Sequence, residues 1–162
     1  MAFAPLNSAE IVNSAAVPPV LNPGQSDGEL RIKTSTLTVT SAGKDCTANL
    51  MRLPAGHIRI FPRQSYIRIE DAVAACNGSI GLAAYTAANN GASVSADTDA
   101  LYASGDLGNS TSGLQLLGTQ EDGELFLDVN SKTGVVVTLT VTSDQNINAG
   151  TIMTSIAYVP VA

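Results

Sequence analysis

The stretch LPAGHIRIFPRQSYIRIEDAVAACNGSIGLAAYTA, residues 53–87, decides the fold class. Apolar and polar residues alternate in GHIRI (56–60) and again in YIRI (66–69), which is the period-two pattern of a strand with one buried face. Pro62 lies between the two runs and has no N–H to donate to a strand ladder. The stretch therefore predicts two short strands that meet at a corner.

The same alternation recurs on both sides of this stretch. It is clearest in GVVVTLTVT (134–142), where Val135, Val137, Leu139 and Val141 are predicted to point inward. One helical turn, 97–103, is expected inside a long polar connection, and Asn77-Gly78 is expected to form a turn. Short strands at such spacing predict an all-β fold, an antiparallel β-sandwich or jelly-roll-like barrel, over residues 30–162. The other predicted strands are 30–40, 45–53, 79–87, 114–117, 125–130 and 151–161.

Residues 1–29 differ in composition from the rest of the chain. They contain four of its seven prolines, which fix φ and keep the preceding residues extended, so we expect an N-terminal arm outside the packed sheets. The arm is also apolar at Phe3, Leu6 and Ile11, which is unusual for a solvated tail. Two interpretations stay open: the arm folds over its own domain, or it lies across a neighbouring subunit.

Charge is unevenly distributed along the chain. The net charge is -6, but residues 1–30 carry -3, residues 31–68 carry +6 and residues 69–162 carry -9. Either the segments neutralise one another within the domain, or basic and acidic surfaces lie on different faces and let subunits dock. The net negative charge and the absence of tryptophan argue against a nucleic-acid partner.

Cys46 and Cys76 are the only cysteines, and His57 is the only histidine, so the usual zinc ligand sets cannot be assembled. The first residues lack the basic and apolar regions of a signal peptide, so we expect two buried free thiols rather than a disulfide. No apolar run approaches the roughly 20 residues that a membrane helix needs, so no membrane partner is expected.

The sequence offers little for catalysis. His57 has no second histidine, thiol pair or nucleophile-elbow serine to work with. Asp97 and Asp99, like the acidic run 121–124, are expected in solvated turns, and the spacing after Asp97 does not match a calcium loop. We therefore predict no enzyme activity and no cofactor. The residues of the opening stretch are predicted instead to form an interface, together with the arm: His57, Arg59, Arg63, Tyr66, Arg68, Phe3, Leu6 and Ile11.

Five short motifs carry a family resemblance: LPAG (53–56), IGLAAYT (80–86), ADTDAL (96–101), GDL (105–107) and NAGT (148–151). In these motifs the chain resembles small structural proteins of tailed bacteriophages that are encoded beside the major capsid protein. The resemblance implies a virion component, a capsid decoration or cement protein, and carries no catalytic residues.

The hypothesis from the sequence is a non-enzymatic protein, made in the host cytoplasm, that decorates the exterior of a phage capsid. It would assemble with itself as a homotrimer and bridge neighbouring subunits of the major capsid protein. Two alternatives remain: a fimbrial or pilin-type subunit, which should carry a signal peptide, and a phage tail receptor-binding module, which should present more loop aromatics than Tyr85 and Tyr102.

Overall fold

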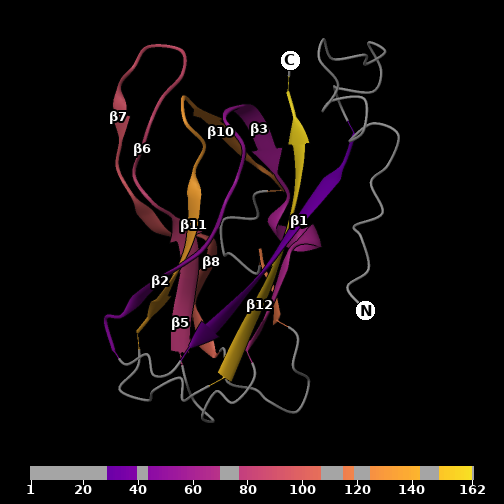
Figure 1. Ribbon diagram of the computed structural model, residues 1–162, viewed down its shortest axis with the longest axis vertical. Coiled ribbons are helices and arrows are strands. Elements are labelled where there is room, and N and C mark those ends of the chain that lie inside the picture. The colour runs from indigo at the N-terminus through magenta and orange to yellow at the C-terminus, as the bar shows by residue number, and fades with distance from the viewer. Residues whose placement is uncertain are drawn as a thin grey trace.

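The computed structural model describes residues 29–39, 44–69, 77–106, 115–118, 125–142 and 150–161. In these residues two antiparallel sheets pack face to face, which confirms the predicted all-β sandwich (Figure 1). The first sheet contains β10 (Leu127–Ser131), β3 (Gly56–Ile60), β12 (Gly150–Pro160), β4 (Tyr66–Ile69), β9 (Gln115–Leu116) and β1 (Arg31–Val39). The second contains β2 (Thr47–Arg52), β11 (Val136–Val141), β5 (Asn77–Leu82) and β8 (Asp97–Asp106), and β6 (Tyr85–Thr86) pairs with β7 (Ser93–Val94) in a separate hairpin.

Strand β12 is the centre of the first sheet. Along one edge it pairs with β1 over the whole of β1, from Arg31 opposite Tyr158 to Val39 opposite Gly150. Along its other edge it pairs first with β4 and then with β3. Pro160 is tolerated at the end of this central strand because the pairing with β1 stops at Tyr158, so Pro160 has only β3 beside it.

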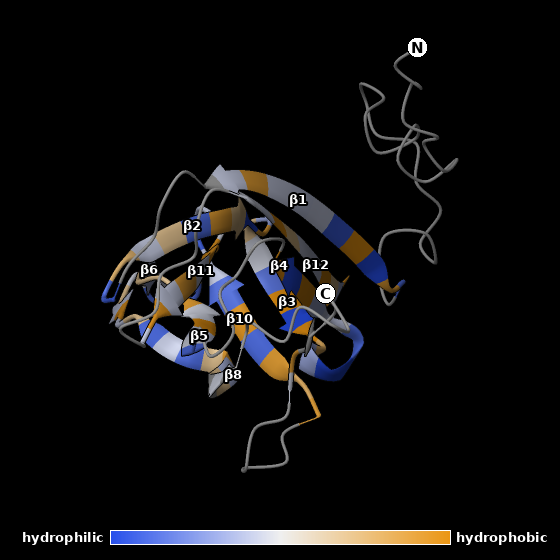
Figure 2. Cartoon of the chain, turned by 90° about the horizontal axis from the view of Figure 1, so that it is seen from below, coloured by the Kyte–Doolittle hydropathy of each residue, from blue (hydrophilic) through white to orange (hydrophobic). Residues whose placement is uncertain are grey.

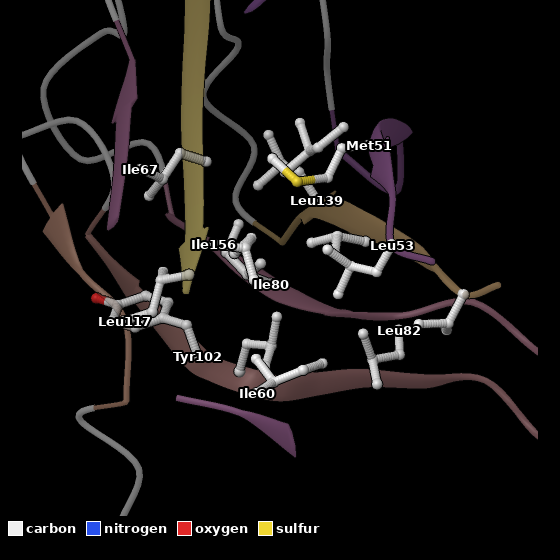
Figure 3. Close-up of a cluster of buried hydrophobic side chains, with 14 of the residues drawn as sticks. Met51, Leu53, Ile60, Ile67, Ile80, Leu82, Tyr102, Leu117, Leu139 and Ile156 are labelled. Carbon is white, nitrogen blue, oxygen red and sulfur yellow. The ribbon is translucent and has the colours of Figure 1, made fainter. Parts of the chain in front are cut away.

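The core lies between the two sheets and is made by the inward residues of their alternating strands (Figure 3). Four residues in and just before β11 were predicted to point inward, and all of them are buried: Val135, Val137, Leu139 and Val141. Burial of each such aliphatic side chain contributes about 1.5–3 kcal/mol relative to leaving it exposed. The largest fully buried side chains include Leu53, Ile60, Ile80, Leu101, Leu139, Ile152 and Ile156.

Strand β1 closes one side of the sandwich toward β2. The Ser35 hydroxyl donates to the Leu50 carbonyl at 2.7 Å, and the Lys33 ammonium donates to the Arg52 carbonyl at 2.7 Å. These bonds tie the edge of the first sheet to the edge of the second. Figure 2 shows β1 along the margin of the domain, with apolar residues toward its two ends and a stretch of intermediate hydropathy between them.

Two local predictions were wrong. Residues 97–103 belong to strand β8, not to a helical turn, because pairing with β5 and the burial of Leu101 and Tyr102 outweigh a weak local helix preference. Asn77-Gly78 begins β5 instead of forming a turn. Small residues on β5 serve the close approach of β8: a side chain at Gly81 would overlap the backbone of Asp97 and Thr98.

The cysteine prediction holds in one respect and fails in another. Cys46 is a free thiol, as expected, but it is exposed rather than buried, since it stands just before β2 at the outer edge of its sheet. Cys76 lies outside the described residues, as do Phe3, Leu6 and Ile11 of the predicted arm. Within the described part of the chain, no helix is long and apolar enough to cross a bilayer.

Candidate interaction surfaces

A one-turn 3₁₀ helix, η1 (Pro62–Gln64), forms the predicted corner between β3 and β4. Ile60 pairs with Tyr158 and Tyr66 pairs with Ser155, so the chain advances six residues beside three residues of β12. The three residues of η1 account for the difference. β3 and β4 are thus one strand, interrupted where proline removes a donor and then resumed on the same edge of β12.

Ser65 fixes this corner from inside. Its buried hydroxyl donates to the Phe61 carbonyl at 2.8 Å and accepts the backbone N–H of Ala157 at 2.9 Å. The Ala157 N–H lies on the β3 and β4 edge of β12, opposite η1. On this edge no strand pairs with Ala157, so the serine supplies the missing acceptor. Sequence reasoning did not single out Ser65. Its place directly after a proline-interrupted strand was the available signal.

Gly118 supports the same corner from the other side. It has a φ of 77°, in the left-handed region, and a Cβ there would stand 2.8 Å from the Arg63 nitrogen and 2.9 Å from the Pro62 Cβ. Glycine is therefore required both by the backbone conformation and by the lack of space. The corner is a rigid element that presents Arg63, which is exposed, to the solvent.

The structure divides the predicted interface residues between two surfaces on the outer face of the first sheet. His57 and Arg59 lie on β3 beside β10, while Tyr66 and Arg68 lie on β4 beside β12. Arg63 lies on η1 between them. We name the first surface the ion-pair half (β3 and β10) and the second the groove half (β1, β12, β4 and η1).

In the ion-pair half, Arg59 already has its partner within the domain. Its Nε and Nη2 donate to the two carboxylate oxygens of Asp128 at 2.8 and 3.0 Å, across the directly opposed β3–β10 pair. The guanidinium also lies 4.0 Å from the centre of the Phe126 ring, in a cation–π contact. His57 Nε2 is 3.9 Å from the same carboxylate. One carboxylate of the acidic C-terminal segment thus neutralises one arginine of the basic segment.

The ion pair shifts both titrations in the expected directions. The hydrogen bond from Arg59 lowers the pKa of Asp128 below its ordinary value, against a smaller opposing effect of burial. The hydrogen bond to Asp128 in turn raises the pKa of Arg59. Both side chains are more than a third exposed, so solvent screens the pair and its contribution to stability is small.

In the groove half, side chains from three strands line an open depression of about 500 Å³. Thr36, Met153 and Arg68 lie opposite one another in one cross-strand row, and in the next row Thr34 and Tyr66 stand on either side of the buried Ser155. Ser35 and Thr154 complete the lining. The lining combines threonine hydroxyls, a tyrosine, an arginine and an apolar methionine that is 37% exposed. Such a surface can contact both apolar groups and backbone polar groups of a partner.

Of the carboxylates considered from the sequence, Asp97 and Asp99 lie among the described residues. Asp97 and Asp99 are exposed on strand β8 rather than in a turn, and partial burial, with a hydrogen bond to Asp99, raises the pKa of Asp97. Among the described residues no group of three or more histidine, cysteine or acidic side chains could hold a metal ion. The acidic run 121–124 lies outside these residues.

No protein-family model and no curated protein matches the sequence. Among solved structures, a chain titled "Capsid of Ralstonia phage GP4" matches with a TM-score of 0.62 at 14% identity, covering 84% of this chain and 87% of that one. A chain from the acidic stable capsid of Helicobacter pylori bacteriophage KHP30 matches with a TM-score of 0.49 at 11% identity, covering 84% of this chain and 91% of that one. A chain from the capsid of cyanophage Pam1 matches with a TM-score of 0.45 at 14% identity, covering 97% of this chain and 99% of that one. The first match shows that the two chains share a fold over most of their lengths.

Proposed function

We propose that the protein is a non-enzymatic structural component of a phage virion that decorates the capsid exterior and bridges neighbouring capsid subunits. The observation that carries this proposal is the shared fold with a chain of the Ralstonia phage GP4 capsid over 84% of this chain. The short motifs quoted above point to the same class of protein.

The distribution of apolar side chains on the surface suits binding to a partner better than catalysis. Exposed apolar side chains lie on the outer face or at its margin, at Leu30, Ile32, Phe126 and Met153, while the interior of the sandwich is filled by aliphatic side chains. Partners of the proposed assembly are the major capsid protein and other copies of the chain, as a trimer. Repetition of modest contacts over a lattice supplies avidity that no single contact has.

The fimbrial alternative gains no support from the thiols. A subunit assembled after export would be favoured by a bonded cysteine pair, whereas Cys46 is free. The proposed capsid role needs no disulfide.

The proposal is tested on purified phage particles. Virions should contain the protein in a fixed ratio to the major capsid protein, and particles that lack it should release DNA at a lower temperature. A protein found only in tail fractions, or particles of unchanged heat resistance without it, would contradict the decoration role.

A further inference from the structure

The β6–β7 hairpin ends in a tip, residues 87–92, that lies apart from the core and from both halves of the outer face. Figure 1 shows the two strands and their connecting loop extending past β11 at one end of the domain. The tip carries the sequence Asn90-Gly91, and both residues are exposed. Residues 81–96 around it contain no charged side chain. A carboxylate formed at Asn90 would therefore be the first charge in this part of the chain.

Asparagine followed by glycine is the sequence most prone to spontaneous deamidation, because glycine has no side chain to hinder attack by its own backbone nitrogen. The Gly91 nitrogen attacks Cγ of Asn90, a C–N bond forms, and the side-chain amide leaves as ammonia, taking up the proton of the Gly91 nitrogen. One water then opens the cyclic imide to aspartate or isoaspartate. The reaction consumes only water, so the residues of the tip are sufficient for it.

Backbone hydrogen bonds restrain both reacting groups in the folded tip. The Gly91 N–H donates to the Ala87 carbonyl at 3.0 Å, so the nitrogen that must lose its proton is engaged. The Asn90 Oδ1 accepts the Ala92 N–H at 2.9 Å, which fixes the side-chain amide. The Ala87 N–H in turn donates to the Ala92 carbonyl at 2.8 Å and closes the tip. Because attack on Cγ requires the Gly91 nitrogen to leave its bond to Ala87, the folded tip opposes the reaction.

The hairpin is held to the rest of the domain at the end of β10. The Lys132 N–H donates to the Thr86 carbonyl at 2.8 Å, and the Ala88 N–H donates to the Asn130 carbonyl at 3.1 Å. With only two residues in each of its strands, the hairpin can open locally without unfolding either sheet. We propose that Asn90 is a deamidation site that the folded tip protects and that reacts when the tip opens.

Asn77-Gly78 is the other Asn-Gly pair of the sequence and provides an internal comparison. Gly78 is buried in β5, where it pairs with Val141 of β11 and with Gly105 of β8. Freeing its nitrogen requires the second sheet to open, which costs more free energy than opening the tip. In the folded chain Asn90 should therefore convert faster than Asn77, although both are followed by glycine.

The site requires no capsid partner, so the purified full-length chain is sufficient for the test. The chain is incubated at mildly alkaline pH in buffer and in guanidinium chloride, and peptide mapping by mass spectrometry follows aspartate and isoaspartate at both asparagines. In denaturant the two sites should convert at rates within roughly threefold of each other, since no fold protects either. In buffer Asn90 should convert at least about tenfold more slowly than in denaturant, and Asn77 more slowly still.

Two tyrosine variants test whether the hairpin provides the protection. Tyr85 is half-buried on β6 and packs against the core, so Tyr85→Ala should loosen the hairpin and speed Asn90 conversion in buffer by roughly threefold or more. Unchanged conversion at Asn77 shows that the second sheet stays folded. Tyr66→Ala removes a half-buried tyrosine from the other sheet and should leave Asn90 unchanged.

Four results would overturn the proposal. The first two are no conversion of Asn90 in denaturant and conversion of Asn90 in buffer as fast as in denaturant. The third is faster conversion of Asn77 than of Asn90 in the folded chain. The fourth is an equal rate at Asn90 in the Tyr85→Ala and Tyr66→Ala variants, because the hairpin would then not protect the site.

Discussion

The two halves of the outer face of the first sheet handle charge and apolar exposure in different ways. In the ion-pair half, Arg59 is held by Asp128 in two hydrogen bonds and stacks on Phe126, all within one domain. In the groove half, threonine, methionine, tyrosine and arginine side chains line an open depression about 500 Å³ in volume. The stretch interrupted at Pro62 contributes one strand to each half, β3 to the ion-pair half and β4 to the groove half.

The difference shows that a cluster in sequence need not be a cluster in function. His57, Arg59, Tyr66 and Arg68 stand within twelve residues, and β3 and β4 share β12 as a neighbour, yet on the edge away from β12 the η1 corner leaves β3 paired with β10 and β4 paired with β9. In the ion-pair half Arg59 is already neutralised within the domain, so the groove half is the better candidate for contacts with other chains.

The largest expected effect is on the free energy of unfolding, and it should differ between the inner and the outer face of β12. Ile156 is fully buried, so Ile156→Ala should lower the free energy of unfolding by about 2–5 kcal/mol through lost burial and the cavity left behind. Met153→Ala, on the outer face of the same strand, should change it by less than about 0.5 kcal/mol. Denaturant unfolding of both variants measures this, and equal losses would mean that the outer face is part of the core.

The corner that separates the halves depends on Ser65. Ser65→Ala leaves the Ala157 N–H without its acceptor in a buried place, and should cost about 1–3 kcal/mol of unfolding free energy. Gln64→Ala changes an exposed residue of the same turn and serves as the control. If the two variants unfold at the same denaturant concentration, the hydroxyl does not hold the corner.

Charge reversal distinguishes the halves in assembly. Arg63 is exposed and forms no ion pair with a described residue, so Arg63→Glu should weaken binding to capsids about fivefold, or ~1 kcal/mol. Arg59→Glu should also impair assembly, but less, because Asp128 already neutralises Arg59. Co-sedimentation with capsids at several salt concentrations shows which of the two variants loses more binding. A stronger effect at Arg59 would reverse the roles assigned to the two halves.

The smallest effect is expected at the ion pair itself. Asp128→Asn should lower the unfolding free energy by about 0.2–1 kcal/mol at neutral pH, as for other exposed pairs. The pKa of Asp128 is lowered in the folded state, so its contribution is present above the ordinary value of 3.8 and is lost as pH falls from there through the folded-state pKa. The difference between wild type and variant should therefore shrink below about pH 4, and a difference that grows on acidification would contradict the ion pair.

Strand positions were the most predictable part of the fold, because alternation in β3, β4 and β11 follows directly from one buried face. The helical turn at 97–103 was wrong because β8 derives its conformation from pairing with β5, which is not local information. The corner at Pro62 could be predicted, but not the register change that it produces.

The candidate surface was only partly predictable, for the same physical reason. The sequence places Arg59 and Asp128 sixty-nine residues apart, and only the pairing of β3 with β10 brings them together. The groove likewise combines Thr36, Met153 and Arg68 from three distant segments. Whether Phe3, Leu6 and Ile11 join an interface stays a prediction, as does the division of the chain at residues 29 and 30.

The proposed role in the virion is tested most directly by adding the purified full-length protein to empty capsids that lack it and counting bound copies by sedimentation and quantitative mass spectrometry. A structural decoration protein should saturate at a fixed copy number set by the capsid lattice, and should raise the temperature at which the capsids disassemble. Binding that does not saturate, or no binding to capsids by a folded protein, would contradict the account.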